Sequence, residues 1–124
     1  MVKILVAEDE RDIRELIAFT LRFAQFDVEL ARNGKEAVEK APHVRPDLIL
    51  MDVRKPLMTG YQACKALKEN DITKDIPIIF LSAKGQESEI QEGLEVGATD
   101  YILKPFVLDE LTMQVKRILK QYEK

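Results

Sequence analysis

Short unbroken runs of apolar residues recur along the chain and predict the strands of a buried sheet. A run of this kind suits a strand that is covered on both faces, as the strands of a parallel sheet are. The clearest example stands between Asp47 and Asp52. A further stretch, from Asp27 to Ala31, alternates acidic and apolar residues and predicts a more exposed strand at the edge of the sheet. The continuous runs lie at Lys3–Ala7, Leu48–Met51, Ile76–Leu81 and Asp100–Leu103.

Between these strands, apolar residues three or four positions apart predict amphipathic helices. The first stripe consists of Ile13, Leu16, Ile17, Leu21 and Ala24. Asn33 followed by Glu36 is typical of a capped helix start with a capping-box glutamate. We expect helices over Asp12–Ala24, Lys35–Ala41, Tyr61–Asn70, Glu87–Val96 and Leu108–Gln121.

Two local features refine this pattern. Pro42 and Pro46 are expected to bracket a loop, and His43 within it is expected to be a solvated side chain without a metal or catalytic role. Gly93 lies inside the predicted helix over Glu87–Val96, where glycine costs about 1 kcal/mol relative to alanine. We therefore expect this helix to be the least firmly packed.

Five predicted strands alternate with five predicted helices, which indicates an α/β fold. Because crossovers between parallel strands are right-handed, this alternation predicts a doubly wound five-stranded parallel sheet with helices on both faces. A chain of 124 residues suits a single domain, which we assign to residues 1–124.

Composition narrows the range of functions. A net charge of -3 gives no basic surface for nucleic acid or anionic membrane, and no apolar run has the length of a membrane span. The single cysteine, Cys64, excludes an internal disulfide and fits a reducing cytoplasm. Since Leu67 follows three residues later on the same predicted helix face, we expect Cys64 to be a small core residue.

Chemically capable side chains stand at the carboxyl ends of four predicted strands, where open α/β sheets bind their ligands. The acids after the first strand could equally form a solvated turn that favours the next helix dipole, and Ser82 could be a cap or turn residue. Together, however, these side chains provide what phosphoryl transfer requires. They are Glu8 and Asp9, then Asp52, then Ser82, then Lys104.

Each of these side chains has an expected role in that chemistry. Asp52 could accept a phosphoryl group as an aspartyl-phosphate, provided that Mg²⁺ held by the neighbouring acids offsets its charge. Lys104 would contribute an ammonium group and Ser82 a hydroxyl donor to the phosphoryl oxygens. Tyr101 and the loosely packed fourth helix are the candidates for reading out the change in charge.

With these features, the sequence resembles the receiver domains of two-component response regulators along essentially its whole length. The resemblance implies a flavodoxin-like sheet of order 2-1-3-4-5 and phosphorylation of Asp52 by a sensor histidine kinase or a histidine phosphotransfer protein. The output would be a downstream effector protein or a fused output domain. The matching motifs are Glu8-Asp9-Glu10, Leu50-Met51-Asp52-Val53, Pro56 with Gly60, Ser82-Ala83, Gly97-Ala98 and Tyr101 to Phe106.

The resemblance also assigns the site residue by residue. It implies that Mg²⁺ is bound by Glu8, Asp9, Asp52 and the backbone carbonyl of Arg54. It implies that Ser82 and Lys104 bind the phosphoryl group, and that Ser82 and Tyr101 act as the conformational switch. The peptide bond between Lys104 and Pro105 is expected to be cis.

This chain departs from the family pattern at several positions. Arg54 and Lys55 replace two frequent methionines, and we expect Arg54 to alter the lifetime of the phosphoryl group. Thr59 replaces a frequent aspartate, which we expect to change only a helix cap.

The last two elements lack the charge pattern of the receivers that dimerise through their fourth and fifth helices. Gln114 stands in place of an arginine, which leaves Asp100 without that partner, and Glu92 would face Glu110. We therefore expect a monomer or a weak dimer.

Three rival functions are weaker. A flavin-binding module of the same topology would need an anion-accepting loop where this chain has Glu8-Asp9-Glu10. A nucleotide-dependent enzyme would need a phosphate-binding glycine motif that the sequence lacks. A phosphorylation-independent receiver-like binding module is the serious alternative. Because the expected chemistry modifies the chain itself, we do not expect an enzyme.

Overall fold

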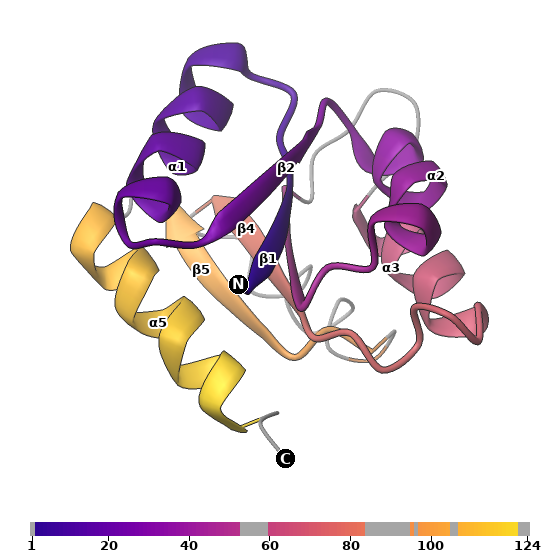
Figure 1. Ribbon diagram of the computed structural model, residues 1–124. Coiled ribbons are helices and arrows are strands. Elements are labelled where there is room, and N and C mark those ends of the chain that lie inside the picture. Colours follow the sequence, from indigo (N-terminus) through magenta and orange to yellow (C-terminus); the bar gives the residue numbers. More distant parts are fainter. Residues whose placement is uncertain (1, 53–59, 84–94, 96, 105–106, 122–124) are drawn as a thin grey trace.

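Five parallel strands form one sheet in the order β2-β1-β3-β4-β5 (Figure 1). The computed structural model describes residues 2–52, 60–83, 95, 97–104 and 107–121. This arrangement confirms the predicted fold class and the strand order that the family resemblance implied, with β2 at the edge. The strands are β1 (Lys3–Ala7), β2 (Asp27–Ala31), β3 (Leu48–Asp52), β4 (Ile78–Ala83) and β5 (Asp100–Lys104).

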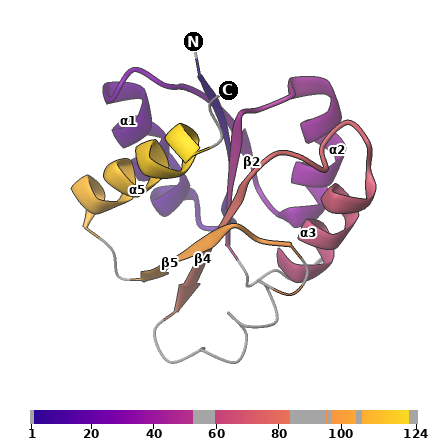
Figure 2. The same cartoon turned by 90° about the horizontal axis from the view of Figure 1, so that it is seen from below.

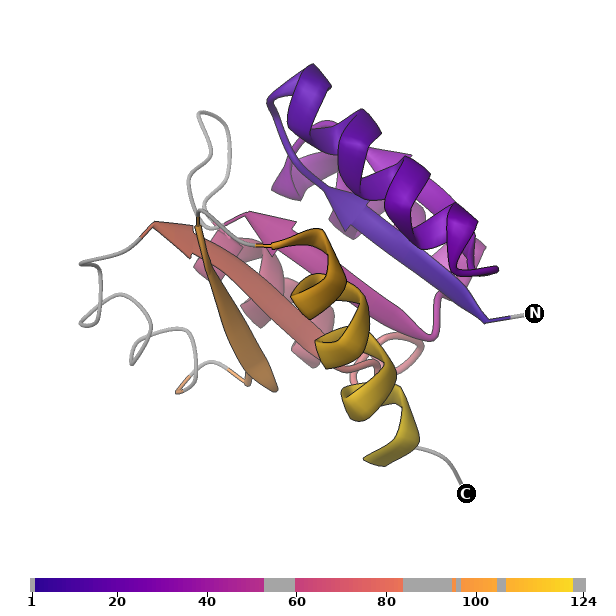
Figure 3. The ribbon, with the colours of Figure 1, turned by 90° about the vertical axis from the view of Figure 1, so that its left-hand side faces the viewer.

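Helices cover both faces of the sheet. α1 (Arg11–Phe23) and α5 (Leu108–Gln121) lie on one face, and α2 (Gly34–Val44) and α3 (Gly60–Glu69) lie on the other (Figure 2). Figure 3 shows α1 and α5 together on the face that is turned toward the viewer. Among the helices that the structure describes, none combines the length and the apolar character of a membrane span.

Two apolar cores result, one under each helix pair, because successive strand residues point to opposite faces. In β3, Leu48 and Leu50 belong to the core beneath α1 and α5, whereas Ile49 and Met51 belong to the core beneath α2 and α3. Cys64 is fully buried in the second core, which confirms its prediction as a core residue.

α2 differs from its prediction at its C-terminal end. The N-cap is as expected, since the Asn33 side chain accepts a hydrogen bond from the backbone N–H of Glu36 at 2.9 Å. The expected capping-box contact differs, because the Glu36 carboxylate accepts from the backbone N–H of Arg32, one residue before the cap, at 3.3 Å. The predicted loop after Ala41 was wrong, because the helix continues through Pro42 and His43 to Val44. It ends where the backbone of Arg45 turns left-handed, with φ of 52°, and its N–H bonds to the Ala41 carbonyl at 2.8 Å. His43 is nevertheless exposed, as predicted.

The buried face of α1 is also narrower than the predicted stripe. Ile17, Ala18 and Leu21 are its buried residues, whereas Leu16 is 48% exposed. α1 is oriented with Ile17 facing the sheet, so Leu16 lies beyond the edge of the buried face of the helix. The predicted helix over Glu87–Val96, Thr59 and the bond between Lys104 and Pro105 fall partly or wholly outside the described residues.

Candidate acidic site at the strand ends

Three carboxylates come together at the carboxyl ends of β1 and β3. Glu8, Asp9 and Asp52 each offer one oxygen atom, and these atoms lie within 4.8 Å of one another. The register of the sheet explains why these carboxylates are close together. Ala7 pairs with Met51, and the next residues along the chain are Glu8 and Asp52. The strand-end acids that the sequence singled out are therefore brought to one place.

Two of these three acids are buried. Glu8 is 0% and Asp52 is 5% exposed, whereas Asp9 is exposed. In the described part of the chain, Thr73 is the only other buried polar side chain, and its hydroxyl donates to the Leu67 carbonyl at 2.6 Å. Buried carboxylates this close repel each other unless positive charge or hydrogen bonds offset the cost. A set of carboxylate oxygens is also what Mg²⁺ prefers, so the residues fit that ion.

Backbone contacts hold Glu8 in place. Its N–H donates to the Ala31 carbonyl of β2 at 3.1 Å, and its Oε1 accepts from the Glu10 N–H at 3.3 Å. The guanidinium of Arg14, in the first turns of α1, donates to the Glu8 carbonyl at 2.9 Å. Sequence reasoning missed Arg14. The available signal was a basic residue one turn into a helix that follows three acids.

The other two predicted strand-end residues lie on the neighbouring strands. Asp52 pairs with Leu81, so Ser82 is one residue further along β4. In the next pairing, Ser82 lies opposite Leu103, and Ala83 lies opposite Lys104. The backbones of Asp52, Ser82 and Lys104 therefore lie at the same side of the sheet, where the carboxyl ends of β3, β4 and β5 are. Arg54 lies outside the described residues.

Tyr101 is half-buried in β5, opposite Phe80 of β4, and packs against the core beneath α2 and α3. α5 is tied to this part of β5, since Gln114 Nε2 donates to the Tyr101 carbonyl at 3.0 Å and to Asp100 Oδ2 at 3.2 Å. Arg117 also pairs with Asp100 Oδ2 at 3.2 Å. Asp100, which lacks the expected arginine at position 114, is therefore bound by Gln114 and Arg117 of its own chain. Glu92 lies outside the described residues.

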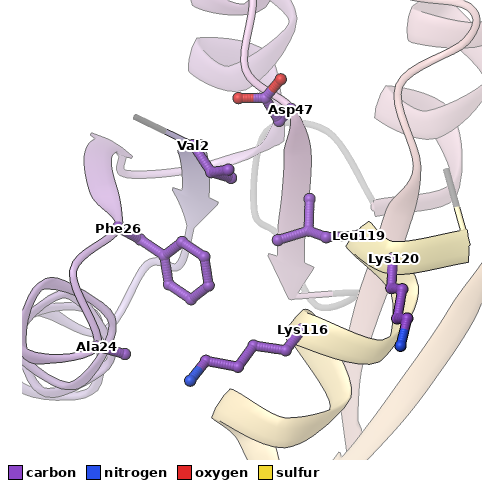
Figure 4. Close-up of a pocket in the computed structure, with 7 residues that line it drawn as sticks. All are labelled: Val2, Ala24, Phe26, Asp47, Lys116, Leu119 and Lys120. Atoms are coloured by element: carbon purple, nitrogen blue, oxygen red, sulfur yellow. The ribbon is translucent and has the colours of Figure 1, made fainter. Parts of the chain in front are cut away.

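A separate hollow of about 500 Å³ lies at the opposite ends of the strands (Figure 4). Val2 precedes β1 and Asp47 precedes β3, so this hollow is at the amino ends of the strands. Its lining also includes Phe26, Lys116 and Lys120. It contains none of the acids of the cluster and takes no part in that site.

The sequence of residues 4–116 matches the response regulator receiver domain family. The chain belongs to this family. It is 43% identical over 118 residues to the phosphate regulon transcriptional regulatory protein PhoB of Pseudomonas aeruginosa, a match that covers 95% of this chain and 52% of that protein. The chain thus spans about half the length of this relative. It is a receiver domain of two-component signalling.

Solved receiver structures have the same fold. The chemotaxis protein CheY4 of Vibrio cholerae is 37% identical with a TM-score of 0.90, covering 95% of this chain and 98% of that one. The receiver domain of the sensor histidine kinase PA1611 from Pseudomonas aeruginosa is 33% identical with a TM-score of 0.88, covering 96% and 98%. That second structure has a magnesium ion coordinated in its active site cleft.

Proposed function

We propose that Asp52 accepts a phosphoryl group from a phosphohistidine on a sensor histidine kinase or a histidine phosphotransfer protein. The observation that carries this proposal is the position of Asp52, which is 5% exposed at the end of β3 and lies within 4.8 Å of the oxygens of Glu8 and Asp9. A downstream effector protein or an output domain on the same polypeptide would read the change. Since such a kinase draws its phosphoryl group from cytoplasmic ATP, the proposal includes a cytoplasmic location.

In the transfer step, a carboxylate oxygen of Asp52 attacks the phosphorus atom and forms a P–O bond. The P–N bond of the donor breaks, and the imidazole nitrogen leaves with the electron pair. Mg²⁺, when bound, would offset the negative charge of the phosphoryl oxygens. Glu8, Asp9 and Asp52 would hold this ion, together with the Arg54 carbonyl. Ser82 and Lys104 would bind the phosphoryl oxygens by hydrogen bonding and by charge.

The readout would use β5. Ser82 would move toward the new phosphoryl group, and Tyr101, which is half-buried on the neighbouring strand β5 opposite Phe80, would change position. The Gln114 contacts to Asp100 and Tyr101 connect that strand to α5 and offer a route for the change to reach the surface. Because the chain modifies only itself in this process, we propose a signalling domain over residues 1–124 and not an enzyme.

Intact-mass measurement tests this proposal. The chain is incubated with Mg²⁺ and a small phosphodonor such as acetyl phosphate, beside Asp52→Asn and a chelated sample. We expect one added phosphoryl group on the parent and none on the variant or the chelated sample. Asp47→Asn is the matched control, because Asp47 is an exposed acid next to the other end of β3. It should be phosphorylated like the parent.

The alternative is a phosphorylation-independent binding module, which the unusual Arg54 and Lys55, two and three residues after Asp52 in the sequence, would favour. A folded parent that gains no mass in the presence of Mg²⁺ would support this alternative and overturn the proposal. An adduct that persists in Asp52→Asn would place the modification on another residue and contradict the assignment of Asp52.

A further inference from the structure

The solvent-facing side of α1 carries two exposed aromatic rings. Phe19 is 68% and Phe23 is 83% exposed, and their rings stack with centroids 6.5 Å apart. Seven large apolar side chains are exposed in the described part of the chain, and α1 contributes three of them, the third being Leu16. Contiguous exposed apolar groups of this kind are characteristic of interaction surfaces.

A hollow of about 530 Å³ lies directly beside these rings. Ala18 of α1 and Leu30 of the edge strand β2 contribute apolar side chains to the lining of this hollow. The surface therefore has both a protruding part and a hollow part. We name it the α1 patch, and it consists of Glu15, Ala18, Phe19, Arg22, Phe23 and Leu30.

The α1 patch is complementary to itself. Glu15, Ala18, Phe19 and Arg22 follow the spacing of three, four and seven residues that places side chains on one face of a helix. If two copies of α1 pack antiparallel around a two-fold axis between Ala18 and Phe19, Glu15 of each copy lies opposite Arg22 of the other. Phe19 then lies opposite Ala18, a buried side chain that lines the partner's hollow, so that each ring faces that hollow.

We propose that the α1 patch is an interface between two copies of this chain. A two-fold symmetric dimer needs one surface that supplies both halves of every contact, and the α1 patch meets this requirement in shape and in charge. The contacts that Glu15 and Arg22 make within one chain are compatible with the proposed dimer. Among the described residues, Glu15 forms an exposed ion pair with Arg11 at 3.2 Å, and Arg22 is oriented by donating to the Val28 carbonyl at 3.2 Å.

The expected association is weak. One face of a helix of 13 residues buries less surface than the roughly 1,200 Å² at which stable interfaces begin, so we expect a dissociation constant of about 10–1,000 µM. The α1 patch shares no residue with the acidic cluster, so this proposal does not depend on phosphorylation of Asp52.

Sedimentation velocity over a wide range of concentration tests the interface. The parent should shift reversibly from monomer to dimer as concentration rises. Phe19→Ser should weaken dimerisation by at least about tenfold, because it removes the side chain that faces the hollow. The matched control is Met113→Ser on α5, which is also 68% exposed but outside the α1 patch, and it should dimerise like the parent.

A charge exchange distinguishes this interface from general stickiness. Glu15→Arg and Arg22→Glu should each weaken the dimer by about tenfold, because each sets like charges opposite one another. The double variant restores opposite charges and should regain most of the parent's affinity. A parent that stays monomeric, a dimer that tolerates Phe19→Ser, or a double variant no better than the single ones would each overturn the proposal. Because these side chains are exposed, unchanged thermal melting would confirm that every variant folds.

Discussion

At the scale of single residues, burial decides what the cysteine can do. Cys64 is fully buried in α3, and this desolvation raises the pKa of its thiol to about 11, although the charge of Lys68 opposes the shift. In the unfolded chain the thiol would ionise near its ordinary value of 9.0. Between these two values the folded chain keeps a proton that the unfolded chain loses. The free energy of unfolding should therefore fall as pH rises through this range, by about 1–3 kcal/mol.

Chemical denaturation of the parent and of Cys64→Ala at about pH 8 and about pH 10.5 measures this effect. Other groups titrate in both proteins, so the informative quantity is the difference between their unfolding free energies. That difference should move in favour of the variant at the higher pH. A difference that does not change with pH would contradict the assignment of the pKa shift to Cys64.

Which single residues could be predicted from the sequence depended on their distance from a strand. Glu8 and Asp52 directly follow or end apolar strands, and parallel pairing fixes where strand ends meet. A basic residue after three acids was a signal for Arg14, but its hydrogen bond to the Glu8 carbonyl could not be predicted, because that bond depends on the orientation of α1 relative to β1. The contacts of Gln114 with Asp100 and Tyr101 likewise depend on the position of α5 over β5.

At the scale of whole elements, α2 shows how tertiary context overrides a local signal. Pro42 lies inside this helix, although proline lacks the N–H that would bond to the Val38 carbonyl. The buried neighbour Ala41 and the bond from Arg45 N–H to the Ala41 carbonyl keep the last turn helical. A sequence rule that ends helices before proline therefore placed the boundary too early.

Removing this proline should stabilise the protein. Pro42→Ala restores an N–H donor and removes the steric conflict of the ring, so we expect the free energy of unfolding to rise by about 1–2 kcal/mol in urea denaturation. Part of the gain is offset because the unfolded chain becomes more flexible. Pro46→Ala is the matched control, since Pro46 is buried outside the helix and its replacement should lower stability. A loss of stability in both variants would show that Pro42 causes no strain in α2.

At the scale of the whole molecule, the fold could be predicted because its signals are repeated along the entire chain. Each apolar strand is followed by a segment with helical spacing, and right-handed crossovers leave few arrangements. The order of the strands needed the family resemblance, since alternation alone does not say which strands are neighbours. The surface chemistry of α1 was outside the reach of periodicity, because exposed and buried apolar residues look the same in a sequence.

Binding of a metal ion at the acidic cluster should be coupled to the stability of the entire domain. Its carboxylates come from two neighbouring strands and meet only in the folded chain, so an ion bound among them stabilises that state alone. Saturating Mg²⁺ should raise the free energy of unfolding by about 1–3 kcal/mol and raise the melting temperature in a calorimetric scan. Asp9→Asn should lose most of this gain. Glu10→Gln should keep it, because Glu10 is an exposed neighbouring acid outside the cluster. An equal response of both variants to Mg²⁺ would mean that the ion acts on the general acidity of the surface and not at this site.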